Sequence, residues 1–168
     1  MKEDLIKNLR FVLSNGRVAC SPDEKARSLI EGFQKQKQVF ASLIRNNPPE
    51  NKIQVFLEEN PVILLHAMLD GFYPIASPRS ALFAKVQLGS EYEADFVYCS
   101  GNSLGTYWTF IELERCNVPL FNKKGDQSKY LSHALRQVLN WQSWLADHSE
   151  YALDRLMNLI EESGMDWT

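Results

Sequence analysis

Apolar and polar residues alternate along the stretch from Trp108 to Arg115, which reads Trp-Thr-Phe-Ile-Glu-Leu-Glu-Arg. Successive side chains of a β-strand point to opposite faces, so this stretch divides into two sets. One set is Tyr107, Thr109, Ile111 and Leu113, and the other is Trp108, Phe110, Glu112 and Glu114. The pattern predicts an apolar strand that ends in two carboxylates on one side.

Two further runs with strand character precede this one. Leu82 to Leu88 alternates apolar and polar residues and stops at Gly89, and Glu93 to Cys99 follows it. The segment 100–105 is rich in Gly, Ser and Asn, which favour turns. We therefore expect three successive strands in an antiparallel meander, an arrangement that brings Asp95 near Glu112.

Helical spacing of apolar residues marks most of the remaining chain. The predicted helices span 1–14, 21–45, 50–59, 128–147 and 149–163, with a turn or helix over 61–69. Ser21, Pro22 and Glu24 form a capping box that starts the second helix. The core stripe expected on the helix 128–147 is Leu131, Leu135, Val138, Trp141 and Leu145.

The best candidate for a boundary is Asn46-Asn47-Pro48-Pro49, because the residue before a proline avoids helical geometry. It divides the chain into an N-terminal helical segment, 1–47, and a second domain, 50–168. The second domain is expected to be α/β, with a helix, the three-stranded meander and a further helix in order.

Composition narrows the classes of function. The chain has 168 residues and a net charge of −3, which argues against a protein that coats nucleic acid with a basic surface but leaves a local basic groove open. Its three cysteines are far apart, so neither a disulfide framework nor a zinc site is indicated. The longest apolar run, 61–65, is too short to cross a bilayer, and we expect a soluble cytoplasmic protein without a membrane partner.

The three carboxylates Asp95, Glu112 and Glu114 indicate a functional site. Two like charges about 4 Å apart repel by roughly 4 kcal/mol at an effective dielectric near 20, so the group needs a cation, a proton or wide spacing. Lys85 either leans toward the carboxylates or is an ordinary surface lysine. Gln137, one helical turn before Trp141, is either a surface residue or holds a phosphate or a water beside them.

The ordered set of these motifs resembles the PD-(D/E)xK nuclease superfamily. Within this superfamily, five short segments of the chain are similar to the Shedu anti-phage defence nuclease domain, and the similarity covers 52–145. They are Phe56-Leu57-Glu58-Glu59-Asn60-Pro61, Leu88-Gly89, Asp95-Phe96-Val97, Ile111-Glu112-Leu113-Glu114-Arg115 and His133-Ala134-Leu135-Arg136-Gln137-Val138-Leu139-Asn140-Trp141. The spacing from Gln137 to Trp141 also resembles the glutamine motif of RecB-like nucleases.

The resemblance implies a restriction-endonuclease-like core and a metal-dependent DNA endonuclease. Asp95 and Glu112, with the backbone carbonyl near Leu113, would hold one or two Mg²⁺ or Mn²⁺ ions. Glu58 or Glu59 would match the supporting helix glutamate, and Gln137 the helix glutamine. The implied partners are double-stranded DNA and further copies of the chain.

The sequence departs from the superfamily pattern in two places. Glu114 stands where the superfamily usually has the lysine that orients the attacking water, so Lys85 would have to supply the amine, or Glu114 would bind metal or act as a base. The superfamily core also closes with a strand after the glutamine helix, whereas the segment 149–168 has a helical pattern, as in a piece of a longer protein or a core without its last strand.

Three hypotheses follow. The first is a metal-dependent DNA endonuclease in anti-phage defence. The second is a catalytically impaired nuclease-like module that binds nucleic acid or a partner protein, favoured by Glu114 and the acidic composition. The third is an oligomerisation or interaction domain, favoured by the N-terminal helices and the tryptophan-rich helix 128–147.

Overall fold

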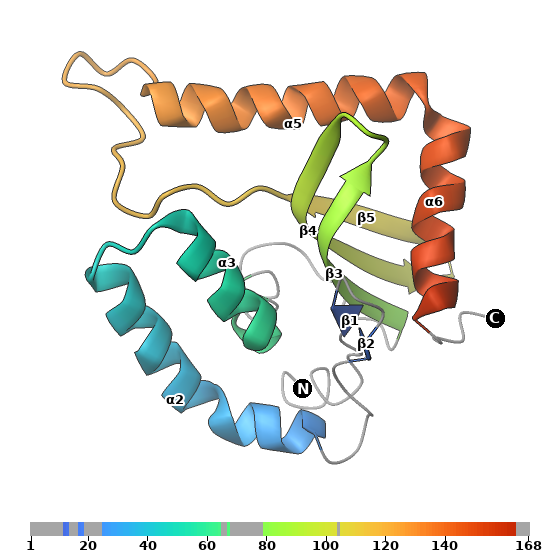
Figure 1. Ribbon diagram of the computed structural model, residues 1–168, viewed down its shortest axis with the longest axis horizontal. Helices are drawn as coiled ribbons and strands as arrows, with labels where there is room; N and C mark the ends of the chain where they lie inside the picture. The colour runs from blue at the N-terminus through green and yellow to red at the C-terminus, as the bar shows by residue number, and fades with distance from the viewer. Residues whose placement is uncertain are drawn as a thin grey trace.

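The computed structural model describes residues 12–13, 17–18, 25–64, 67, 79–103 and 105–163. In this part the fold is mixed α/β, with helices around a three-stranded antiparallel sheet in the order β3-β4-β5 (Figure 1). The strands are β3 (Arg79–Leu88), β4 (Tyr92–Asn102) and β5 (Gly105–Ile111). The predicted meander is confirmed, and both of its hairpins follow the chain order.

The helices cover both faces of the sheet. They are α2 (Lys25–Arg45), α3 (Glu50–Glu59), α5 (Lys129–Asp147) and α6 (Ser149–Glu162). Helices α5 and α6 pack on one face, and α2 and α3 lie against the other (Figure 1). The result is a three-layer arrangement with one apolar cluster on each side of the sheet.

Helix α2 ends where the sequence places the boundary. Asn47 adopts a left-handed conformation, with φ of 52°, and its amide donates to the carbonyl of Ile44. Asn tolerates this conformation better than most residues, and Pro48 prevents the helix from continuing. Helix α2 nevertheless packs on the same apolar cluster as α3, and the rings of Phe40 and Phe56 stack with centroids 5.4 Å apart.

Helix α5 begins as the sequence predicts. Ser128 is its N-cap, and the Ser128 hydroxyl accepts a hydrogen bond of 3.2 Å from the amide of Leu131. The expected core stripe is wrong in part, because Leu135 is 41% exposed and Val138 is 44% exposed. The N-terminal half of α5 extends past the sheet (Figure 1), so its apolar residues have no strand beneath them. Trp144, outside the expected stripe, is buried against the β3–β4 turn.

Two other predictions need correction. The helix expected over 1–14 is wrong at its end, because Val12–Leu13 forms strand β1, which pairs with β2 (Arg17–Val18). Residues 1–11 and the capping box at Ser21 lie outside the described residues, as does most of 65–69. The last strand, β5, ends at Ile111, so Glu112 and Glu114 follow the strand instead of forming part of it. In the described part of the chain, no helix is long and apolar enough to cross a membrane.

The pleat of the sheet is interrupted at Lys85. The buried residues of β3 that face α5 and α6 are Ala81 and Phe83 before Lys85, but Val86 and Leu88 after it. Lys85 has φ of 53°, in the left-handed region that a strand residue rarely adopts. This conformation shifts the alternation of side chains by one residue. Both halves of β3 therefore keep apolar residues on the face that α5 and α6 cover.

Strand β4 changes its alternation at the residue opposite Lys85. Ala94 and Val97 both face α5 and α6, although they are three positions apart, while Phe96 faces α2 and α3. Asp95 lies opposite Lys85, between the paired positions Ala94 and Phe96. The two charged residues therefore meet where both strands break their regular pleat.

Candidate functional site

Asp95 is the centre of the candidate site. It is buried, and its Oδ1 lies 2.5 Å from the Nζ of Lys85. Its Oδ2 accepts a hydrogen bond of 2.8 Å from the amide of Leu113, just beyond the end of β5. The Asp95 carboxylate thus connects all three strands of the meander.

The ammonium group of Lys85 lies among carboxylates. It also approaches Oε1 of Glu93 at 3.5 Å. Burial disfavours the charged form, but the hydrogen bond and charge of Asp95, together with Glu93, outweigh burial and raise the pKa of Lys85 above its ordinary value. Lys85 is therefore protonated at neutral pH, and it is the strand lysine that the sequence analysis considered for the site.

Glu112 lies next to this pair at the end of β5. Burial, followed by the negative charges of Asp95, Glu50 and Glu114, raises the pKa of Glu112 to about 7, while a hydrogen bond from Gln137 opposes the shift. Its environment therefore favours the protonated carboxyl more than water does. The cluster holds more negative charge than one lysine neutralises.

Glu50 belongs to the same cluster, although the sequence analysis did not select it. Burial raises the pKa of Glu50, followed by the charges of Glu114 and Asp95. Glu50 is in the first turn of α3, where the helix dipole favours a carboxylate. The signal in the sequence was its helical spacing from Ile53 and Leu57, the buried residues of α3, which places Glu50 on the sheet-facing side.

The glutamates selected on α3 take other positions. Glu58 accepts a hydrogen bond of 2.7 Å from Gln54, and the same amide nitrogen donates to the backbone carbonyl of Asp95 at 3.3 Å. Glu59 is exposed at the last residue of α3, about 14 Å along the helix axis from Glu50. The structure therefore brings Glu50 and Gln54 to the site, and it does not bring Glu59 there.

Helix α5 supplies two side chains from the other face of the sheet. Gln137 donates a hydrogen bond to the Glu112 carboxylate. One turn earlier, Nδ1 of His133 lies 3.5 Å from Oε1 of Glu114. His133 was not among the predicted site residues; its one-turn spacing from Gln137 in the sequence is the signal that points to it.

Two amide oxygens at the edge of the cluster are buried without a hydrogen-bond partner in the described part of the chain. They are Oε1 of Gln54 and Oε1 of Gln137. A buried acceptor without a donor is unfavourable by about 1–3 kcal/mol, so such atoms mark positions where water or a ligand belongs. Gln54 is on α3 and Gln137 is on α5, so the two glutamines belong to opposite layers of the fold.

The donor set fits a hard divalent cation. Across the described residues, no three His, Cys, Asp or Glu side chains lie in position to enclose a metal ion. Mg²⁺ does not need such a cage, because it binds through one or two carboxylates and keeps several waters. Asp95 and Glu112 offer the carboxylates, the excess negative charge favours a cation, and the unpaired amide oxygens can accept from its waters.

One comparison with known proteins gives a match. A family model described as "Shedu protein SduA, C-terminal" matches residues 47–165, which is most of the chain. The matched range contains every residue of the cluster, from Glu50 to Gln137. Neither the curated proteins nor the solved structures include a match.

Proposed function

We propose that this chain, which belongs to the Shedu SduA C-terminal family of anti-phage defence proteins, is a metal-dependent nuclease domain that hydrolyses phosphodiester bonds in double-stranded DNA. The proposal includes a restriction-endonuclease-like core built on the β3-β4-β5 meander. Glu50, Asp95 and Glu112 are its acidic residues, and Lys85 is its basic residue.

One observation carries the proposal: the Nζ of Lys85 lies 2.5 Å from Oδ1 of Asp95. Glu114 occupies the position where nucleases of this superfamily usually have lysine, but Lys85 brings an ammonium group to the carboxylates from β3. A lysine held in a left-handed backbone conformation within a strand is strained, and strain of this kind concentrates at functional sites.

The acidic residues would hold the metal. Asp95 and Glu112, with the carbonyl oxygen of Leu113, supply the oxygen ligands that Mg²⁺ and Mn²⁺ prefer. When bound, the cation supplies Lewis acidity and charge neutralisation next to the phosphate. Gln137 orients Glu112 through their hydrogen bond.

The other polar side chains divide the remaining roles. Lys85 donates hydrogen bonds to the attacking water and offsets negative charge that develops on the phosphate. Gln54 positions the backbone of Asp95 through its hydrogen bond to the Asp95 carbonyl. Glu114 faces His133 at the edge of the cluster. His133 there offers Glu114 a proton acceptor or a charge partner.

Incubation of the purified chain with plasmid and linear DNA in Mg²⁺ or Mn²⁺ tests this proposal. Wild type should cut, and Asp95→Ala and Glu112→Ala should not. Glu59→Gln is the charge-matched control, because Glu59 is exposed at the far end of α3, and it should cut like wild type. DNA that stays intact with wild type under all these conditions refutes the nuclease activity of this chain.

A second function, nucleic-acid binding without cleavage, is favoured by the hydrogen bonds of Asp95. Its two carboxylate oxygens already bond to Lys85 and to the amide of Leu113. A cation must compete with the Lys85 ammonium for Oδ1, and a protein that never exchanges this bond would bind DNA without cutting it. A gel shift with intact DNA in the presence of Mn²⁺ would select this alternative.

We also propose that the chain forms homo-oligomers. Helix α5 exposes Leu135, Val138 and Leu139, which share one face at helical spacing. Exposed apolar residues grouped in this way are typical of a contact surface. Light scattering should give a mass above that of the monomer, and a monomer at all concentrations would contradict the proposal.

A further inference from the structure

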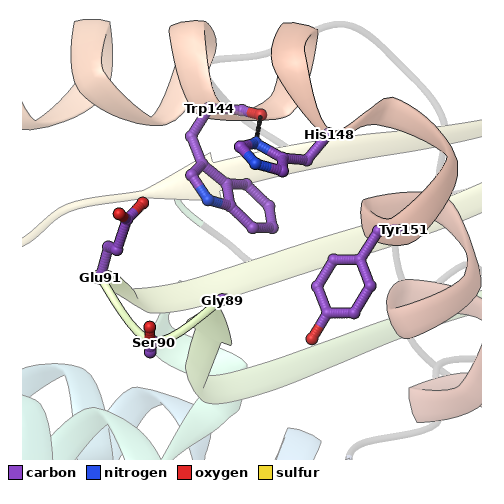
Figure 2. A pocket seen from close by; sticks show the side chains of 6 residues that line it. All are labelled: Gly89, Ser90, Glu91, Trp144, His148 and Tyr151. Carbon is purple, nitrogen blue, oxygen red and sulfur yellow. Dashed lines mark hydrogen bonds between the residues drawn. The ribbon is translucent and has the colours of Figure 1, made fainter.

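A second feature lies at the C-terminal end of α5, on the side of the helix that faces the sheet. It is a cavity of about 570 Å³ lined by Gly89, Ser90, Glu91, Trp144, His148 and Tyr151 (Figure 2). The first three residues form the turn between β3 and β4, and the last three come from the α5–α6 corner. The cavity is open to solvent, because Ser90, Glu91, His148 and Tyr151 are exposed.

Trp144 forms a fixed wall of this cavity. A Cβ on Gly89 would lie 2.9 Å from Cζ2 of Trp144, so the turn backbone packs directly on the indole. The ring of His148 stacks on Trp144 with centroids 4.9 Å apart and planes 18° from parallel. Since Trp144 is only 7% exposed, the aromatic surface available to a ligand comes from its neighbours.

Tyr151 offers that surface. It is 55% exposed, and its ring stands at 78° to Trp144 with centroids 6.1 Å apart. Figure 2 shows Tyr151 and Glu91 on opposite sides of Trp144. Both residues line the same cavity, so a planar ligand that stacks on Tyr151 can present one edge to the Glu91 carboxylate.

Two side chains of the cavity, His148 and Glu91, offer hydrogen-bond acceptors. The backbone carbonyl of Trp144 can only accept a hydrogen bond, so Nδ1 of His148, 3.0 Å away, carries the proton. In the neutral ring, Nε2 of His148 is then an acceptor, as is the Glu91 carboxylate. With no lysine or arginine among the lining residues, the cavity disfavours a phosphate group.

A guanine base matches this set of groups. Its N1–H and N2–H₂ donors are adjacent and meet both oxygens of a carboxylate, whereas adenine, cytosine and thymine each offer a single donor group on that edge. Base–aromatic stacking is the usual way in which proteins hold unpaired bases. An exposed tyrosine opposite a carboxylate supplies both interactions.

The cavity is also placed for a strand that passes through the carboxyl cluster. Gln137, Trp141, Trp144 and His148 follow one another at helical spacing on one face of α5. Gln137 and Trp144 are about 10 Å apart along the helix axis. Measured along α5, the carboxyl cluster and the cavity are therefore separated by a distance that a few nucleotides of single strand span.

We propose that this cavity binds an unstacked guanine base in a single-stranded segment of the DNA substrate, an inference that rests on the proposed nuclease function for the identity of the strand. Tyr151 stacks on the base and Glu91 accepts from its Watson–Crick edge. The cavity thereby gives the protein a preference for unpaired guanine near the position of cleavage.

Binding is measured on the full chain in EDTA, so that cleavage plays no part. The probes are a labelled all-thymine single strand, the same strand with one guanine, its fully paired duplex, and free dGMP as competitor. The guanine strand should bind about tenfold more tightly than the thymine strand or the duplex. Tyr151→Ala should weaken guanine-strand binding by about 5- to 150-fold, the loss of one stacked base.

Matched variants separate the cavity from the general surface. Glu91→Gln should reduce the guanine strand to the affinity of the thymine strand, whereas Glu150→Gln should retain the preference. Leu153 is an exposed residue near Tyr151 on α6, and the Leu153→Ala variant should also bind like wild type. Equal affinity of wild type for the two strands, or an unchanged Tyr151→Ala variant, overturns the proposal.

Two further results would assign the cavity to a different ligand and also overturn the proposal. One is dGMP binding as tightly as the guanine strand, which would identify a free nucleotide. The other is displacement by a trimethyl-lysine peptide but not by dGMP, which would identify a cation held by aromatic rings. Cleavage in Mg²⁺ is scored separately, so a guanine preference without cleavage refutes only the nuclease activity, and cleavage without the preference refutes only the cavity assignment.

Discussion

Lys85 and Asp95 face each other across β3 and β4 at the position where both strands interrupt their pleat. The Nζ of Lys85 lies 2.5 Å from Oδ1 of Asp95, and Lys85 holds a backbone φ of 53°. A strained backbone and a partly buried ion pair therefore occur at the same point of the sheet, at the candidate site.

Removal of the Lys85 amine should lower the rate of DNA cleavage while the protein stays folded. We expect Lys85→Met to lower kcat by about 10²- to 10³-fold, as loss of a single charge-stabilising donor does in other enzymes. Lys85→Arg keeps the charge but not the geometry and should retain only part of the activity. Cleavage rates and circular dichroism of the three proteins give the measurement, and full activity of Lys85→Met would exclude a role in the reaction.

The backbone strain at Lys85 can be measured apart from its charge. Glycine adopts positive φ without steric penalty, whereas alanine does not. Lys85→Gly and Lys85→Ala lose the same ion pair, so we expect the glycine variant to be more stable by about 1–2 kcal/mol in urea unfolding. A more stable alanine variant would show that this position is not left-handed in solution.

Glu112 should make stability depend on pH. Its folded-state pKa is raised from 4.5 to about 7, so folding favours the protonated carboxyl. The favourable contribution is complete below the unfolded pKa and disappears as the pH rises through about 7. In EDTA, wild type should therefore lose stability between about pH 5 and pH 8 relative to Glu112→Gln, by about 1–2 kcal/mol after allowance for screening at a half-buried group. Parallel stability profiles of the two proteins would contradict the raised pKa.

Gly89 should be intolerant of a side chain. It has φ of 65°, and an added Cβ would lie 2.9 Å from Cζ2 of Trp144. Gly125 has φ of 86° with nothing within 4 Å of the equivalent position, so Gly125→Ala measures the backbone strain alone. We expect Gly89→Ala to be less stable than Gly125→Ala by about 1–3 kcal/mol, the usual effect of overpacking. Equal unfolding midpoints would mean that Trp144 moves aside freely.

A divalent cation should bind at the carboxyl cluster. Calorimetric titration of wild type with Mn²⁺ should give a heat of binding, and Asp95→Asn should abolish it because the amide is a weaker oxygen ligand. Glu59→Asn, at the exposed end of α3, is the control and should leave the heat unchanged. An equal heat from Asp95→Asn would place the cation elsewhere.

The sequence by itself determined the meander, the start of α5 and the closeness of Asp95 to Glu112. These features follow from local rules: period-two alternation, a serine N-cap, and the order of carboxylates along paired strands. Short-range patterns of this kind survive in the tertiary structure because the apolar faces they define are the faces that pack. The family resemblance drawn from the same residues is confirmed over 47–165.

The tertiary structure alone decided the position of Lys85, the entry of Glu50 into the cluster and the exposure of Leu135 and Val138. The left-handed conformation of Lys85 is maintained because it keeps the apolar residues on both sides of Lys85 buried against α5 and α6. Glu50 joins the cluster because α3 is anchored by Ile53 and Leu57 against the sheet. Leu135 and Val138 remain exposed because α5 is longer than the surface it covers. Each outcome depends on how whole elements overlap in space, which residue spacing along the chain does not encode.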